Sequence, residues 1–208
     1  RELRPGEPCD IDPPVVLKPV DDGSSVDLRI CRTTEEIERA RRELEPRRSR
    51  LMAESYIRGR EVTVGIVAGR ALPLIEIVPT VQFYDYEAKY FRDDTRYILA
   101  PALPSGLAES LAAGTVNLFE RLGCRDVARA DFLLEEAPNG QLRSWFLEIN
   151  TMPGFTTHSL VPMAAAHASM DMPTLCASLV DRALARGAGP REPATASAIG
   201  GAGAPVRG

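Results

Sequence analysis

Two carboxylates and one amide in the second half of the chain have the types and spacing of ligands for a divalent cation. Asp131 precedes an Asn-Gly pair at residues 139–140, and Glu148 and Asn150 follow it. Asn-Gly between two apolar runs is a strong signal for a β-hairpin. If these two residues are the turn, Asp131 faces Glu148 across the hairpin, and Arg129 faces Asn150.

Two carboxylates that face each other across strands repel unless a cation offsets them. Mg²⁺ prefers oxygen ligands and usually takes one or two carboxylates together with substrate phosphates. The chain has only two histidines, and its four cysteines form no CxxC pair, so a metal here needs oxygen ligands. Asp131, Glu148 and Asn150 therefore predict a site for Mg²⁺ or Mn²⁺. On the residues alone, a carboxylate pair neutralised by Arg129 and a lysine is an equally good interpretation.

Small residues at two further places could bind anionic groups. Residues 23–25, Gly-Ser-Ser, follow a strand that ends in Lys18, and such residues let backbone N–H groups approach phosphate oxygens. Ser159 opens a helix after a Pro-Gly turn, and a helix N-terminus with a hydroxyl binds a carboxylate well. An ordinary turn and an ordinary N-cap are the simpler interpretations. The chain contains neither a Walker loop nor a GxGxxG loop.

The elements that must position these residues follow from periodicity and turn signals. Helices are predicted over residues 33–46, with a capping box of Thr33 and Glu36, 105–122, 159–168 and 173–186. Strands are predicted over residues 15–18, 51–57, 61–68, 71–78, 127–134 and 141–150. This order predicts an α+β fold with antiparallel sheets. Residues 1–13 are predicted to be a lead-in or a cut loop, and residues 187–208 a disordered tail rich in Gly, Ala and Pro.

The composition is that of an ordinary water-soluble domain, with 44% hydrophobic and 26% charged residues in a chain of 208. A net charge of −4 argues against nucleic acid as the main partner, because nucleic-acid binding usually needs a basic surface. No apolar run approaches the roughly 18 residues that cross a bilayer, so no membrane partner is expected. Without a signal peptide, the chain is expected to be cytoplasmic. Because it begins at Arg1, shortly before a strand, we expect it to be a fragment of a longer chain.

Several motifs resemble those of the D-alanine–D-alanine ligases, in the same order, and the resemblance covers about Val15 to Arg186. The motifs are Lys18-Pro19 with residues 23–26, residues 83–90 (FYDYEAKY), residues 129–131, residues 147–156 (LEINTMPGFT) and residues 158–165 (HSLVPMAA). The resemblance implies an α+β ATP-grasp fold, in which antiparallel sheets flanked by helices clamp ATP. It implies a partial central lobe over residues 14–57 and a catalytic C-terminal lobe over residues 58–186, with the family's N-terminal domain absent.

The same resemblance implies an ATP-dependent ligase. Enzymes of this family phosphorylate the carboxylate of one D-alanine, and the amine of a second D-alanine attacks the acyl phosphate, which gives a dipeptide for peptidoglycan precursors. Phosphoryl transfer to a carboxylate brings anions together and therefore needs a metal and cations. The implied cofactors are ATP and Mg²⁺ or Mn²⁺, the partners are two D-alanine molecules, and a homodimer is expected at full length. The isolated chain is expected to be inactive, because the absent domain normally supplies an acidic residue that holds the first D-alanine.

The resemblance also implies a role for each matching residue. Residues similar to the family's metal ligands are Asp131, Glu148 and Asn150. Residues similar to its nucleotide-binding residues are Lys18 and Lys89 at the phosphates, Glu54 and Glu61 at the adenine and the ribose, and Ser55, Tyr56, Ile57 and Leu147 beside them. Residues similar to its catalytic residues are Arg129 and Gly154, which stabilise an oxyanion, and Ser24 and Tyr90 at the first D-alanine. Residues similar to its substrate-binding residues are Ser159 and Leu160, at the second D-alanine's carboxylate, and Tyr84, in a loop that closes over the site.

Two other interpretations stay open, and the chain departs from the family pattern at one informative position. A D-alanine–D-lactate ligase resembles the chain at the metal hairpin, but such enzymes usually lack the loop at residues 86–90. A non-catalytic nucleotide-binding remnant would be consistent with an absent N-terminal domain. Asp27 stands where the family commonly has glycine. We expect its charge either to weaken phosphate binding or to be solvated.

Overall fold

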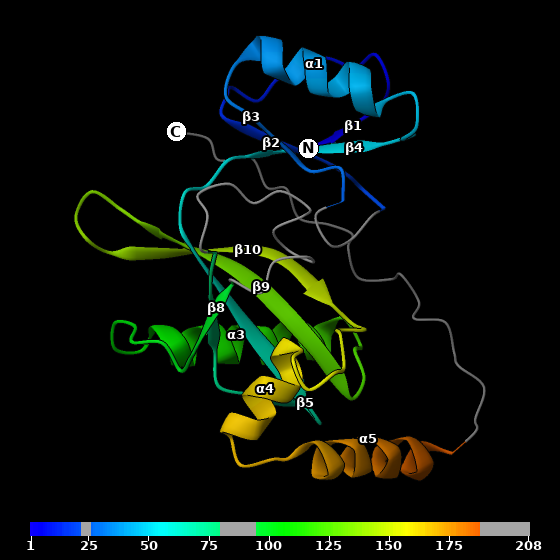
Figure 1. The fold of residues 1–208 in the computed structure, drawn as a ribbon, viewed down its shortest axis with the longest axis vertical. Helices are drawn as coiled ribbons and strands as arrows, with labels where there is room; N and C mark the ends of the chain where they lie inside the picture. Colours follow the sequence, from blue (N-terminus) through cyan, green and yellow to red (C-terminus); the bar gives the residue numbers. More distant parts are fainter. Residues whose placement is uncertain (22–25, 80–94, 188–208) are drawn as a thin grey trace, which may run out of the picture. The chain divides into compact units, whose positions relative to one another are not determined.

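The computed structural model describes residues 1–21, 26–79 and 95–187, and Figure 1 shows their arrangement. These residues form two sheets and four helices, which confirms the predicted α+β class. Four residues with predicted roles lie outside the described residues, as does the predicted tail from residue 188 onward; the four are Ser24, Tyr84, Lys89 and Tyr90.

The first sheet has four strands in the order β1-β4-β2-β3, and every neighbouring pair is antiparallel. Its strands are β1 (Glu2–Leu3), β2 (Val15–Pro19), β3 (Arg29–Cys31) and β4 (Leu51–Ser55). Helix α1 (Thr34–Leu44) covers this sheet (Figure 1). Apolar side chains from the strands and the helix form one buried core, made of Leu3, Val15, Leu17, Cys31, Ile37, Ala40, Leu44, Leu51 and Ala53.

Strand β1 differs from the lead-in or cut loop predicted for residues 1–13. Glu2 pairs with Met52 and Leu3 with Leu51, and the Leu3 side chain is only 1% exposed. A single apolar residue in a polar stretch gives no periodic signal, and its partner strand lies about fifty residues further along the chain. Only the folded sheet therefore identifies β1.

Helix α1 begins as the capping box predicts. The Thr33 hydroxyl accepts a hydrogen bond from the Glu36 N–H at 3.2 Å, and the Glu36 carboxylate accepts one from the Arg32 N–H at 2.6 Å. In the standard capping box the second bond comes from the N-cap residue itself, so here it is displaced by one residue. Ile37, Ala40 and Leu44 are buried at helical spacing, and these residues bury the helix face that meets the sheet.

The second sheet has six strands in the order β10-β9-β5-β7-β8, with β6 paired to β5. Its strands are β5 (Arg60–Val67), β6 (Arg70–Ala71), β7 (Ile75–Val78), β8 (Arg96–Leu99), β9 (Val127–Glu136) and β10 (Leu142–Asn150). Strand β5 is central, and its residues from Val62 to Val67 are all buried. The single strand predicted over residues 71–78 is divided into β6 and β7, since Pro73 between them has no N–H for a ladder bond.

The hairpin between β9 and β10 has a longer turn than the sequence predicted. The Gly140 N–H donates to the Ala137 carbonyl, and the Ala137 N–H donates to the Gln141 carbonyl, both at 2.8 Å. Gly140 has φ 78°, so residues 138–140 form a three-residue loop of the type I turn followed by a left-handed residue. The predicted two-residue turn is therefore wrong, and pairing at this end is shifted by one residue. The contact between the rings of Phe132 and Phe146, with centroids 5.7 Å apart, agrees with the shifted pairing.

The contacts within the chain divide it into two compact units. The first holds residues 1–63, 75–104 and 131–148, and the second holds residues 64–74, 105–130 and 149 onward. The predicted lobe boundary at residue 57 stays a prediction. The helices of the second unit are α3 (Leu107–Arg121), α4 (Leu160–His167) and α5 (Met172–Arg186). In the described part of the chain, no helix has the length and apolar character that a bilayer crossing requires.

Helix α5 is tied to the start of β9 by one carboxylate. Asp126 has a left-handed backbone with φ 61°, and its side chain is 16% exposed. Both guanidinium Nη atoms of Arg186 donate to it, and Arg182 donates from Nε at 3.3 Å. The hydrogen bonds from Arg186 lower the pKa of Asp126.

Replacing Asp126 with Asn should lower the free energy of unfolding at neutral pH by about 1 kcal/mol. Asn tolerates the left-handed backbone, so the change removes the charge and spares the conformation. A carboxylate whose pKa is lowered by folding contributes fully above its ordinary pKa of about 4, and the contribution is lost as the pH falls through the lowered value. The difference in urea unfolding between the two chains should therefore be constant from about pH 7 to about pH 5 and shrink below about pH 4. A difference that does not change with pH would contradict this origin.

Candidate active site

A buried carboxylate in the second sheet is the core of the candidate site. Asp131 in β9 is 6% exposed, and Thr63 in the neighbouring strand β5 is 1% exposed. The Thr63 hydroxyl donates a hydrogen bond of 2.6 Å to Oδ1 of Asp131. A short bond of this kind to a charged acceptor is among the stronger hydrogen bonds in proteins. Thr63 therefore fixes the orientation of the carboxylate predicted to bind a metal.

The other two predicted metal ligands lie on β10, next to β9 in the sheet. Glu148 is exposed and Asn150 is half-buried. The side-chain oxygen of Asn150 accepts a hydrogen bond from the Met152 N–H at 2.9 Å. An amide oxygen has two lone pairs, so this bond orients the side chain and leaves acceptor capacity for a cation.

Packing on the sheet shows which side these side chains take. Ile149 packs against the cluster of Ile66, Phe119 and Ala128. Successive side chains of a strand point to opposite faces. Glu148 directly precedes Ile149, so it points away from that cluster. Asp131 is three residues after Ala128, so it also points away from the cluster.

The pairing of Ala137 with Gln141 at the turn does not by itself place Asp131 and Glu148 on the same face of the sheet. The shifted register, continued unchanged, would put Asp131 opposite Leu147 and Glu148 on the other face. One extra residue in β10 between Phe146 and Ile149 reconciles the two observations, which is the arrangement of a β-bulge. Beyond such a bulge Asp131 faces Glu148 again, so the shifted register at the turn does not overturn their direct pairing, which stays a prediction.

Two residues predicted for opposite parts of a nucleotide site lie together in the first sheet. Lys18 in β2 and Glu54 in β4 form an ion pair, with Nζ and Oε2 2.7 Å apart. Val16 is the direct partner of Glu54, so Lys18 is its diagonal neighbour on the same face. The lysine is 20% exposed and the glutamate 34%. Lys18 thus has a carboxylate partner, and it has to leave or share that partner in order to contact a phosphate.

The residues predicted to flank the nucleotide base follow β4. Ser55 is the last residue of β4 and pairs with Val15. The Tyr56 N–H donates to the Pro14 carbonyl at 3.0 Å, which fixes the chain as it leaves the sheet; Ile57 is half-buried. Glu61 lies in β5, paired with Ile77. The sheets thus position these residues. The backbones of Ser55 and Tyr56 are held by the segment that begins β2.

Gly154 and Ser159 lie close together before α4. The Ser159 hydroxyl accepts a hydrogen bond from the Thr156 N–H at 2.9 Å and lies 3.0 Å from the Thr156 hydroxyl. A Cβ added at Gly154 would lie 3.0 Å from this Ser159 oxygen. Leu160 begins α4 as predicted, with Ser159 at the N-cap position, but the Ser159 side chain makes no capping bond to the helix. Ser159 is therefore the N-cap by position, but its hydroxyl is directed to the loop and does not cap the helix.

Two polar pairs in the second sheet escaped the sequence analysis. Thr63 was missed because threonine is common in strands for its shape alone. Glu76 in β7 is 8% exposed and accepts from Nε and Nη2 of Arg60 at 2.8 and 2.7 Å. The signal that could have found both pairs is a polar side chain within an apolar run, as in the β5 sequence REVTVGIV.

The donor set around Asp131 suits a hard cation. Among the described residues, no group of three or more His, Cys, Asp or Glu side chains could hold a metal. Two carboxylates and one amide oxygen remain as the candidate ligands, and oxygen ligands are what Mg²⁺ and Mn²⁺ take. The residues therefore fit such a metal when a substrate supplies further oxygens.

Comparison with known proteins adds independent findings. Residues 9–181 match the family model described as "D-ala D-ala ligase C-terminus". A D-alanine–D-alanine ligase of Bordetella avium is 40% identical over 171 residues, which are 80% of this chain and 53% of that protein. The corresponding ligase of Dechloromonas aromatica is 41% identical over 170 residues, 82% of this chain and 55% of that protein. The chain thus spans about half the length of these relatives.

Solved structures of the same kind resemble this fold. The D-alanine–D-alanine ligase from Bacillus anthracis complexed with ATP superimposes with a TM-score of 0.72 at 28% identity, over 89% of this chain and 60% of that one. The ligase from Coxiella burnetii has a TM-score of 0.72 at 25% identity, over 89% of this chain and 51% of that one.

Replacing Thr63 with Val should cost about 1–3 kcal/mol of unfolding free energy, because a buried carboxylate loses a hydrogen-bond donor while the side-chain shape is kept. Thr63→Ser is the matched control, since it keeps the hydroxyl and should lose less. Urea unfolding at neutral pH measures both. Equal losses in the two variants would mean that the methyl group, and not the hydroxyl, is what matters at this position.

Proposed function

The chain belongs to the D-alanine–D-alanine ligase family, whose ATP-grasp fold it has, and on this premise we propose that its protein joins two D-alanines at the expense of ATP. The proposed reaction passes through a D-alanyl phosphate and supplies a dipeptide for peptidoglycan precursors. The observation that carries the proposal is the buried carboxylate of Asp131, to which Thr63 of β5 donates a hydrogen bond. Asp131 lies on the hairpin that also carries Glu148 and Asn150. The predicted homodimer and the predicted cytoplasmic location stay predictions.

A metal is the natural complement to Asp131. A carboxylate that is only 6% exposed is costly to bury unless cations or hydrogen-bond donors compensate it. Asp131, Glu148 and Asn150 would hold Mg²⁺ or Mn²⁺, and the bound metal would offset the charge of the transferred phosphoryl group. Thr63 and the Met152 N–H orient two of these three ligands before the metal arrives.

The remaining residues of the proposed site divide between nucleotide and substrates. Lys18 would give its ammonium to the ATP phosphates, and its pairing with Glu54 keeps it close to the sheet until then. Around the nucleotide we place Lys18, Glu54, Ser55, Tyr56, Ile57, Glu61, Lys89 and Leu147. At the reacting groups and the two D-alanines we place Ser24, Tyr84, Tyr90, Arg129, Gly154, Ser159 and Leu160.

Arg129 and Gly154 would stabilise the negative oxygen that forms when the amine attacks the acyl phosphate. The bond between Ser159 and Thr156 holds the Ser159 hydroxyl against Gly154. In this position the hydroxyl and the first turn of α4 can receive the carboxylate of the second D-alanine.

Loss of the metal ligands should abolish turnover. In the complete gene product that contains these 208 residues, Asp131→Asn and Glu148→Gln should each lower the rate of ADP release at least about a hundredfold, because transition-state charge loses its counter-ion. The rate is measured by a coupled ADP assay with ATP, Mg²⁺ and D-alanine. Glu136→Gln is the matched control, since Glu136 is an exposed carboxylate at the far end of the same hairpin. Near-normal rates in the first two variants would remove the proposed metal site.

The second substrate separates the proposal from its nearest rival. ADP release by the unaltered protein should require D-alanine and Mg²⁺, and the product should contain a new amide bond. D-lactate offered together with D-alanine should not replace the second D-alanine. Equal turnover with D-lactate would instead identify a D-alanine–D-lactate ligase, and no turnover with either would favour the non-catalytic remnant. The 208-residue chain is assayed in parallel, where we expect little activity.

A further inference from the structure

Asp27 occupies a backbone position that suits glycine. Its φ is 58°, in the left-handed region that few residues other than Gly, Asn and Asp adopt readily. It follows the Gly-Ser-Ser sequence of residues 23–25 and precedes β3. A glycine would satisfy this backbone without any charge, so the carboxylate of Asp27 needs its own explanation.

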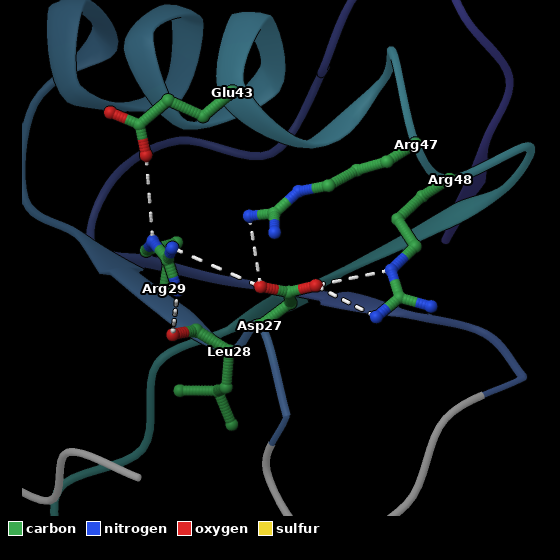
Figure 2. Close-up of polar contacts among 6 residues, drawn as sticks. All are labelled: Asp27, Leu28, Arg29, Glu43, Arg47 and Arg48. Carbon is green, nitrogen blue, oxygen red and sulfur yellow. Dashed lines mark hydrogen bonds and ion pairs between the residues drawn. The ribbon is translucent and has the colours of Figure 1, made fainter.

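Three arginines surround this carboxylate, as Figure 2 shows. Arg48 donates from Nε at 3.1 Å and from Nη2 at 2.8 Å to Oδ2. Arg47 lies 3.0 Å from Oδ1, and Arg29 lies 4.0 Å from the same oxygen. The Asp27 side chain is only 12% exposed. Asp27 is therefore an ion-pair centre and is not solvated, which corrects one of the two expectations for it.

Among the five residues of this cluster, arginines outnumber carboxylates. Three guanidinium groups face two carboxylates, since Glu43 lies 3.7 Å from Arg29. The hydrogen bonds from Arg48 lower the pKa of Asp27, so it is charged at neutral pH. The cluster of Asp27, Arg29, Arg47, Arg48 and Glu43 thus has a net charge of about +1 at neutral pH.

The partners of Asp27 come from both sides of the strand that carries Lys18. Arg29 lies in β3, and Arg47 and Arg48 lie between α1 and β4. In the sheet, β2 lies between β3 and β4. The end of β2 is joined to the same segment, because Pro19 pairs with Leu51 and the Val20 N–H donates to the Arg50 carbonyl at 3.4 Å. The ion pairs of Asp27 therefore join the residues just before β3 to the residues just before β4, beside the end of β2.

We propose that Asp27 is a positioning residue for ATP binding, whose ion pairs with Arg47 and Arg48 fix residues 26–28, which lead into β3, beside the strand that carries Lys18. This inference rests on the proposed function, because it concerns the phosphates of that same nucleotide. Asp27 does not contact the nucleotide in this role. It acts by holding the residues that lead into β3, through its ion pairs with Arg47 and Arg48.

A positioning role and a merely repulsive charge have opposite consequences. If the Asp27 charge only repelled phosphates, its removal would strengthen ATP binding, since like charges oppose each other. If Asp27 fastens the backbone, its removal weakens ATP binding, because the bound arrangement is then only fractionally populated. Asp27→Asn separates these two, since Asn tolerates φ > 0 and keeps the size of the side chain.

The test measures binding of Mg-ATP to the 208-residue chain by titration calorimetry, together with the unfolding temperature. Asp27→Asn should weaken binding by at least about fivefold, the lower end of typical coupling between sites. Asp126→Asn is the matched control: Asp126 also has a left-handed backbone and also binds two arginines, but it belongs to the second unit. It should lower the unfolding temperature to a similar extent and leave the affinity for Mg-ATP unchanged.

The partner side of the ion pair gives a second check. Arg48→Gln should also weaken binding, and the double variant Asp27→Asn/Arg48→Gln should bind no more weakly than the worse single variant, because the two residues act through one contact. Unchanged or tighter binding in Asp27→Asn, or an equal loss in Asp126→Asn, would overturn the inference while the proposed function stands. If the unaltered 208-residue chain binds no Mg-ATP, this inference is overturned, while the proposed function is decided separately by ADP release from the complete gene product.

Discussion

A negative charge buried within the second sheet is the constraint on which the candidate site depends. Asp131 is 6% exposed, and a buried carboxylate must be compensated by donors or cations. The Thr63 hydroxyl supplies one donor from the central strand β5, so the sheet order that places β5 beside β9 fixes the carboxylate's orientation. The exposed Glu148 and the Met152-bound Asn150 complete a set of oxygen donors that a hard cation would bring together.

Charged side chains elsewhere in the described chain are also held by specific partners. Lys18 pairs with Glu54, Arg60 with Glu76, and Asp126 with two arginines of α5. The first two pairs join neighbouring parts of a sheet and the third joins a helix to the start of a strand, so they orient side chains as well as stabilise the fold. The Asp27 cluster follows the same pattern at a left-handed backbone position.

Much of the architecture was accessible from local sequence signals. Thr33 with Glu36, the Asn-Gly pair and the apolar spacing of Ile37, Ala40 and Leu44 correctly predicted a helix and a hairpin, because caps, turns and helical faces depend on neighbours in the sequence. The short strands β1, β3 and β8 were not predicted. Two to four residues carry too little periodicity, and their pairing partners lie far away in the sequence.

The sequence by itself determined the α+β class, the family resemblance and the identity of the oxygen-bearing residues on the hairpin. It did not determine the register there, because a two-residue and a three-residue turn both accept Asn-Gly, and the difference is decided by how Ala137 and Gln141 pair. Nor did it determine that Thr63 meets Asp131 or that Asp27 gathers arginines from β3 and from the α1–β4 connection. The contacts of Asp27 with Arg48 and of Thr63 with Asp131 join segments about twenty to seventy residues apart, and only the packed sheets bring such segments together.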